Sequence, residues 1–241
     1  MLAIVAFGAG YISSIAGSGG LLTLPLLLWA GLPPLQALAT NKVQSALGTL
    51  SSTWNFYRRG QLYIQELLPS ITLALVGSLA GTFTVQRLGN ELLLRLIPVL
   101  LIAIALYFIF SPRMSDQASK PRISRRGFAF LVALPIGFYG GFFGPGMGSV
   151  LPFLFVWLAG YSLPKATAQT KVMVLTINSA SAVLFIVGGH VLWDLAIIMS
   201  MTQMVGARLG SNAVMSSGTR FIQPVIIVVT VIMAIKLLVW P

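Results

Sequence analysis

The sequence contains no cysteine, one histidine and only four acidic residues among its 241 residues. Without cysteine there can be no disulfide, haem thiolate or thiolate metal site. One histidine without paired acids is a poor basis for hydrolytic or metal-assisted chemistry, and Ser13, Ser14 and Ser18 have no evident base. We therefore expect no enzyme activity, no metal and no cofactor.

Charge of either sign is scarce. Charged residues make up 8% of the chain and hydrophobic residues 57%, whereas ordinary soluble domains have about 25% charged residues. Residues 92–110 and 225–239 form apolar runs that approach the roughly 20 residues needed to cross a membrane core of about 30 Å. These runs are continuous, whereas the strands of a membrane barrel alternate. The composition predicts an all-α polytopic membrane protein.

The few acids are placed away from the predicted membrane centre. Glu66, Glu91, Asp116 and Asp194 fall at predicted helix starts or in loops, which argues against a carboxylate proton relay or a sodium site. His190 lies at the boundary of a predicted span, where a solvated imidazole is favoured over a titrating one.

The net charge of +11 would suggest nucleic acid in a soluble protein, but here it is a topology signal. We expect no nucleic-acid partner. The segment 1–16 has no Lys or Arg and leads into a glycine cluster, so we expect it to be retained rather than cleaved as a signal peptide.

The chain contains two copies of one pattern. Gly17-Ser-Gly-Gly-Leu-Leu-Thr-Leu-Pro25 matches Gly144-Pro-Gly-Met-Gly-Ser-Val-Leu-Pro152, and Ala37-Leu-Ala-Thr-Asn-Lys-Val43 matches Ala166-Thr-Ala-Gln-Thr-Lys-Val172. Glycines at 60, 77, 81 and 89 match those at 189, 206, 210 and 218. We predict a duplication: a first repeat at 1–112, a basic linker at 113–126 and a second repeat at 127–241, together forming one transmembrane domain.

Each repeat is predicted to hold a broken helix and three further spans, at 35–57, 64–86 and 91–111 and at 163–187, 191–214 and 221–240. A broken segment covers about 30 residues, or about 45 Å as one helix, which is too long for one upright span and too short for two. The glycines supply the break. A discontinuous or re-entrant element is expected.

The positive-inside rule distinguishes two arrangements of the repeats. If the broken element crosses the membrane, the halves are parallel, with eight basic residues on one side of the membrane and five on the other. If it re-enters, the halves are inverted, and ten basic residues lie on one side of the membrane and three on the other. The ten are Arg58, Arg59, Arg113, Lys120, Arg122, Arg125, Arg126, Lys165, Arg208 and Arg220, and the three are Arg87, Arg95 and Lys236. The sharper asymmetry favours inverted repeats with both termini outside.

The glycine clusters are candidate binding elements. Backbone that is unwound at membrane depth is tolerated where it is buried or lines a polar cavity, and half-helices starting near Leu21 and Ser149 would point positive dipole ends into it. The clusters contain Gly17, Gly19, Gly20, Gly144, Gly146 and Gly148. For Gly77, Gly81, Gly206 and Gly210 we favour close helix packing.

Two equivalent lysines follow the breaks. Lys42 and Lys171 lie roughly 10 to 12 Å into helices that start at Pro34 and Pro164. A lysine at that depth needs an anion, a carbonyl or water, or its stem reaches the interface. Neighbouring polar residues, Asn41, Thr170 and Asn178, could hydrogen-bond a substrate or join helices.

These motifs resemble the TauE/SafE family of sulfite exporters and anion permeases, and more closely its YfcA-like branch. The resemblance rests on Ser14-Ile-Ala-Gly-Ser-Gly-Gly-Leu-Leu-Thr23, Ala37-Leu-Ala-Thr-Asn-Lys42, Gly141-Phe-Phe-Gly-Pro-Gly146 and Lys165-Ala-Thr-Ala168. It implies a multi-pass permease of the bacterial inner membrane for sulfite, sulfoacetate or a related sulfur-containing anion. Gly140 departs from the acidic residue that the branch would have there.

The sequence therefore predicts a permease that holds a small anion between the two glycine breaks and works by alternating access. Two alternatives stay open at this point: a passive anion channel, and a membrane scaffold that transports nothing. The oligomeric state is not predicted.

Overall fold

A computed structural model describes residues 1–17, 19–110 and 117–217, and within these ranges the chain is helical without any strand. The helices are α1 (Leu2–Ala16), α2 (Gly20–Trp29), α3 (Pro34–Arg58), α4 (Ile64–Gln86), α5 (Asn90–Phe110), α6 (Arg125–Phe128), the π-helical turn η1 (Ala129–Ala133), α7 (Leu134–Phe142), α8 (Met147–Ala159), α9 (Leu163–Val187) and α10 (Trp193–Ser217).

Five of the six predicted spans are present as α3, α4, α5, α9 and α10, with ends within about three residues of those expected. The sixth, at 221–240, lies outside the described residues, as do Ser18, Arg113, Asp116, Gly218, Arg220 and Lys236. Three of the described helices are long and apolar enough to cross a membrane: Ile64–Gln86, Asn90–Tyr107 within α5, and Leu163–Val187. The fold is that of an all-helical, multi-pass membrane protein.

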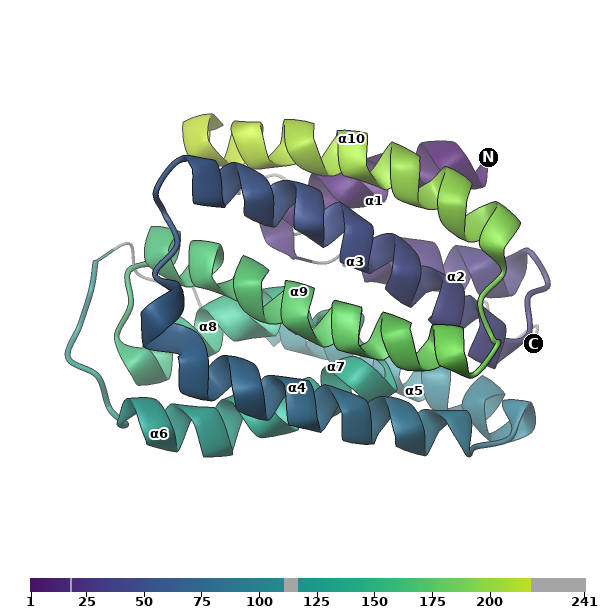
Figure 1. Ribbon diagram of the computed structural model, residues 1–241, viewed down its shortest axis with the longest axis horizontal. Helices are drawn as coiled ribbons and strands as arrows, with labels where there is room; N and C mark the ends of the chain where they lie inside the picture. Colours follow the sequence, from purple (N-terminus) through teal and green to yellow (C-terminus); the bar gives the residue numbers. More distant parts are fainter. Residues whose placement is uncertain (18, 111–116, 218–241) are drawn as a thin grey trace.

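The first glycine break turns the chain back on itself. Gly17 ends α1 in the left-handed region, with φ of 73°, and Gly19 then packs against the Ala9 carbonyl, so that a Cβ at Gly19 would overlap it. In a continuous helix these two residues would lie about 15 Å apart. α1 and α2 therefore form a helical hairpin, with both outer ends on the right of Figure 1.

The second glycine break also turns the chain back on itself. Gly144 and Gly146 have φ of 100° and 88°, and beyond them Phe155 of α8 stacks on Phe128 of α6, with ring centres 4.7 Å apart. A continuous helix would separate these two rings by about 40 Å. The Arg122 N–H donates to the Leu158 carbonyl at 2.9 Å, so α8 ends where α6 begins. The run from α6 to α7 and the returning α8 form a second hairpin.

The two hairpins pack against long helices from the other end of the sequence. Figure 1 shows α1 beside α10 at the top and α7 beside α4 at the bottom, with α3 and α9 between them. Small residues allow the close approach: a Cβ at Gly77 or Gly81 would overlap the backbone of α7, and one at Gly206 or Gly210 would overlap that of α1. The expectation that these four glycines serve helix packing is confirmed.

The central helices α3 and α9 run in opposite directions. Near the start of α3, Thr40 Oγ1 accepts a bond of 3.2 Å from the backbone N–H of Leu192, which lies just beyond the end of α9. Near the other end, Thr53 Oγ1 donates to the carbonyl of Lys171, early in α9, at 3.2 Å. The hairpin that leads into α3 therefore opens at one end of the bundle, and the hairpin that leads into α9 opens at the other.

Candidate functional site

The tips of the two hairpins meet in the middle of the bundle. Gly17 lies directly against Gly148, and a Cβ on either residue would overlap the backbone of the other. Gly20 at the start of α2 is next to Pro145 in the second break. The positive φ of Gly17 and this backbone contact both require glycine. The structure thus brings the two glycine clusters together.

Lys42 and Lys171 are buried, with 2% and 4% of their surface exposed, so neither reaches the membrane interface. The Lys42 ammonium donates a hydrogen bond to the carbonyl of Gly140 in α7, and the Lys171 ammonium donates to the carbonyl of Ser13 in α1 at 2.8 Å. Both acceptors lie in the last turn of their helix, where the dipole is negative. These carbonyls offset part of the cost of burying an ammonium group.

The two lysine contacts occupy equivalent positions in the two predicted repeats, and each lysine bonds the hairpin of the other repeat. Ser13 lies four residues before Gly17, and Gly140 lies four residues before Gly144. Each lysine follows one hairpin in the sequence and bonds the tip region of the other. Gly140 also has no room for a side chain, because a Cβ there would press against Ile177 and Met147, so an acidic residue at this position does not fit the present packing.

A small cavity of about 30 Å³ lies between the tips. Of the predicted site residues, it is lined by Gly17, Gly20, Asn41, Lys42, Gly144, Gly146 and Asn178, together with Ser13, Ser45, Thr49, Phe143, Pro145, Met147 and Val174. Its volume suffices for water but not for a larger anion. In this structure the cavity is therefore too small to hold such an anion.

The amides that face the cavity differ in their bonding. Asn41 Oδ1 accepts from Thr23 Oγ1 at 2.9 Å and from Ser45 Oγ at 3.3 Å, so this side chain is held in place. Asn178 is 3% exposed and lines the cavity, and within the described part of the chain its amide has no hydrogen-bond partner. An amide with unused donors and acceptors beside a polar cavity can bind a small polar solute.

Four predicted site residues do not line this cavity. Gly19 packs on α1, and Gly148 packs on Gly17. The hydroxyl of Thr170 is buried without a partner among the described residues, and Lys171 reaches the site only through its bond to Ser13, which does line it.

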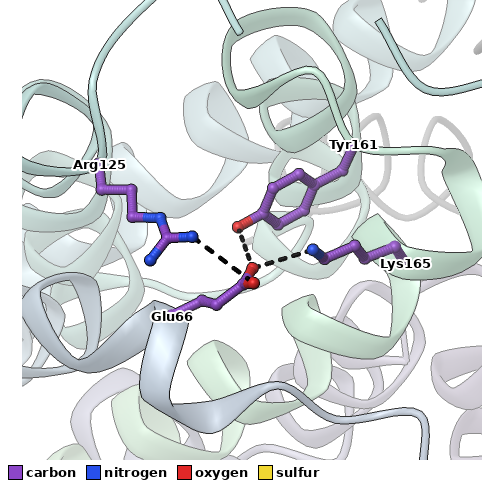
Figure 2. A network of polar contacts seen from close by, with 4 residues as sticks. All are labelled: Glu66, Arg125, Tyr161 and Lys165. Atoms are coloured by element: carbon purple, nitrogen blue, oxygen red, sulfur yellow. Dashed lines mark hydrogen bonds and ion pairs between the residues drawn. The ribbon is translucent and has the colours of Figure 1, made fainter. Parts of the chain in front are cut away.

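A second polar site lies at one end of the bundle, and the sequence did not indicate it (Figure 2). Glu66 in the first turn of α4 accepts from Lys165 Nζ at 2.9 Å and from the Tyr161 hydroxyl at 3.3 Å. The guanidinium of Arg125 is 3.5 Å from the other carboxylate oxygen. Burial, and then the charge of Glu66, raise the pKa of the Tyr161 phenol, so it stays protonated at neutral pH and donates to the carboxylate.

These four residues line a cavity of about 390 Å³, together with Leu67, Ser70, Pro121, Ile123, Ser124, Phe128, Phe155 and Ala159. From the sequence alone, Arg125 is a topology signal, Lys165 is a topology signal and part of the Lys165-Ala-Thr-Ala168 motif, and Glu66 is an acid at a predicted helix start. The one available signal was that Glu66 and Lys165 stand at predicted helix starts and Arg125 in the basic linker, all on the same predicted side of the membrane.

Comparison with known proteins identifies the family of this chain. Residues 2–237 match the family described as "Sulfite exporter TauE/SafE". The chain therefore belongs to the TauE/SafE family. No solved structure matches the chain.

Named relatives cover almost its whole length. It is 42% identical over 238 residues to "Probable membrane transporter protein YfcA" of Escherichia coli (strain K12), covering 99% of this chain and 88% of that protein. It is 40% identical over 237 residues to a "Probable membrane transporter protein" of Haemophilus influenzae, covering 98% and 93%. A relative from Sinorhizobium sp, "Probable membrane transporter protein ORF9", is 40% identical over 240 residues, covering 100% and 92%.

Proposed function

We propose that this protein is a secondary transporter that moves a small anion across the bacterial inner membrane by alternating access. The observation on which this rests is the exchanged pair of buried cations: Lys42 on the Gly140 carbonyl and Lys171 on the Ser13 carbonyl. An intramembrane lysine is a functional group by default, and two equivalent ones beside two broken helices suit the midplane site of a repeat transporter.

Inverted repeats at 1–112 and 127–241, joined by the linker 113–126, are part of this proposal. Three features support them: α3 and α9 run antiparallel, the two hairpins open at opposite ends, and described basic residues gather at one end. There Arg59 donates to Asn212 near the end of α10 at 2.8 Å, and Lys165 and Arg125 surround Glu66. We assign that end to the cytoplasm.

The chemistry of the centre suits an anion. Each ammonium has three N–H donors, and only one hydrogen bond is formed by each lysine within the described residues. The positive ends of α2 and α8 start at Gly20 and Met147 beside the cavity. The family description points to sulfur-containing anions, so we propose sulfite, sulfoacetate or a thiosulfate-like ion.

The small size of the central cavity favours a carrier over a channel. A cavity of about 30 Å³ leaves no room for such an anion, so binding requires the hairpin tips to separate. Rocking of one repeat against the other would open the centre to one side at a time. A conducting channel would keep room for the ion along its whole path.

Flux into proteoliposomes tests the proposal. We expect sulfite uptake that is accelerated by sulfite inside the vesicles, which a carrier shows and a passive channel does not. Lys42→Ala and Lys171→Ala each remove an ammonium group that would bond the anion. Such a charge-assisted hydrogen bond contributes about 1.5–3 kcal/mol, so flux should fall roughly tenfold or more. Lys120→Ala, in the exposed linker, is the matched control. Unchanged flux in both variants would remove the lysines from the mechanism, and absent flux in the parent protein would favour a scaffold.

A further inference from the structure

The cavity beside Glu66 lies away from the centre and has the character of a ligand site. Its volume of about 390 Å³ falls within the range of small-molecule pockets, which are mostly apolar with a few convergent polar groups. Leu67, Ile123, Phe128, Phe155 and Ala159 provide apolar wall, and the polar groups are those around Glu66.

The charges around this cavity do not balance. Glu66 is the one carboxylate that lines it, against the two cations Lys165 and Arg125. α4 and α9, which contain Glu66 and Lys165 in their first turns, both begin here, while α8 ends here at Ala159, so two positive dipole ends face one negative end. The cavity therefore has about one unit of uncompensated positive charge.

Lys165 and Arg125 still have hydrogen-bond donors available for a ligand. Figure 2 shows Arg125, Tyr161 and Lys165 converging on the Glu66 carboxylate. Lys165 has three N–H donors and the guanidinium of Arg125 has five, and among the described residues each of the two makes its one polar contact with Glu66. Lys165 also lies 4.3 Å from the centre of the Tyr161 ring, which holds the ammonium at the cavity wall.

We infer that this cavity is a binding site for an amphiphilic monoanion, whose charged group bonds Lys165 and Arg125 and whose apolar body packs among Leu67, Phe128 and Phe155. Glu66 is an internal anion that shares these donors with the ligand. The site is separate from the centre between the hairpin tips and does not depend on transport. Two sources can provide this chemistry: an organic sulfonate or carboxylate in solution, and an anionic phospholipid.

Binding of pentane-1-sulfonate tests the inference, measured by calorimetry on the full chain in phosphatidylcholine nanodiscs, with empty nanodiscs to subtract partitioning. We expect Arg125→Gln and Lys165→Gln to weaken binding about tenfold. Arg126→Gln, an exposed neighbour that does not line the cavity, should leave binding unchanged. Ala159→Leu should weaken binding by filling the apolar part.

Glu66→Gln is the most discriminating variant. Removal of this carboxylate should tighten the binding of pentane-1-sulfonate about threefold or more. A role for Glu66 in structure alone would leave the affinity unchanged or reduce it. Methanesulfonate, which lacks the apolar body, should bind at least about tenfold more weakly than pentane-1-sulfonate.

Nanodiscs that contain phosphatidylglycerol distinguish the two sources. Competition with the sulfonate identifies lipid as an occupant of the cavity, and lack of competition identifies a soluble anion; both outcomes support the site. Lys42→Ala should leave this binding intact even where it abolishes sulfite flux. The inference is overturned if pentane-1-sulfonate does not bind, or if it binds Arg125→Gln, Lys165→Gln and Glu66→Gln as it binds the parent protein.

Discussion

Lys42 in α3 donates its hydrogen bond to the carbonyl of Gly140, 98 residues further along the chain, in the last turn of α7. With the equivalent contact from Lys171 to Ser13, it ties each hairpin to a long helix that does not follow it directly. A movement that separates the tips must therefore break or exchange these two bonds, which makes them sensitive points of the proposed cycle.

Asn178→Leu should separate binding from stability. The amide of Asn178 lines the central cavity and has no partner among the described residues, so its loss breaks no hydrogen bond in the closed form. We expect no loss in the free energy of unfolding, because a buried amide without a partner is replaced by an apolar group of similar size, while the apparent affinity for sulfite in the flux assay falls roughly tenfold.

Asn41→Leu is the matched comparison for this change. Its Oδ1 accepts from Thr23 and Ser45, so both hydroxyls would lose a buried acceptor and thermal stability should fall. Equal destabilisation by the two variants, with unchanged affinity in Asn178→Leu, would contradict the role of the amide.

Gly17→Ala tests the contact between the tips. Alanine at a φ of 73° costs about 1–3 kcal/mol in backbone strain, and its Cβ would also overlap Gly148. Gly60→Ala measures the backbone strain alone, since Gly60 has a φ of 67° and open space around it. Thermal unfolding in detergent should show a clearly larger loss for Gly17→Ala. Similar melting temperatures would mean that the tips are not in contact.

The proposed topology can be mapped with single cysteines, because the natural chain has none. Arg126→Cys and Gly89→Cys are at exposed positions near opposite ends of α4, and a Cβ at Gly89 meets nothing within 4 Å. In intact cells, a membrane-impermeant maleimide should label Gly89→Cys and not Arg126→Cys. A reporter at the C-terminus should also lie outside the cytoplasm. The reverse labelling, or a cytoplasmic C-terminus, would refute inverted repeats with both termini outside.

Tyr161→Phe should reveal a pH-dependent contribution to stability. The folded protein raises the pKa of this phenol, so the protonated form is the stabilising one. That stability is fully present below the ordinary tyrosine pKa of about 10 and is lost as pH rises through the folded pKa. The parent protein should exceed Tyr161→Phe in melting temperature by a constant margin from about pH 6 to 9, and the margin should shrink in more alkaline buffer. A margin that already varies in the neutral range would contradict this assignment.

The sequence predicted the helices and their breaks well, because both are local properties. Apolar runs set the spans, and Gly17, Gly144 and Gly146 mark the turns since only glycine adopts their φ readily. Burial of Lys42 and Lys171 followed from their distance to the preceding prolines. Inverted repeats and the anion itself stay predictions.

The partners of these residues could not be predicted. Lys42 needed an anion, a carbonyl or water, and only the tertiary structure, which brings this lysine to the tip of the second hairpin, selects the carbonyl of Gly140. In the sequence Glu66 and Lys165 are ordinary helix-start residues and Arg125 is a residue of the basic linker, and their meeting depends on three helices that begin at the same place. Thr170 was expected beside the anion, yet the rotation of α9 turns it away from the cavity.

The connections at the two ends of the bundle are of different kinds. At one end α4 is joined to α9 and α6 by ion pairs of Glu66, whereas at the other the start of α3 is joined to α5 by a neutral bond of 3.3 Å from the Leu35 N–H to Asn90 Oδ1. Dissolved salt screens exposed charges and leaves neutral hydrogen bonds nearly untouched. A rise in ionic strength on the Glu66 side should therefore weaken the ion pairs at that end and leave the bond between Leu35 and Asn90 nearly unchanged.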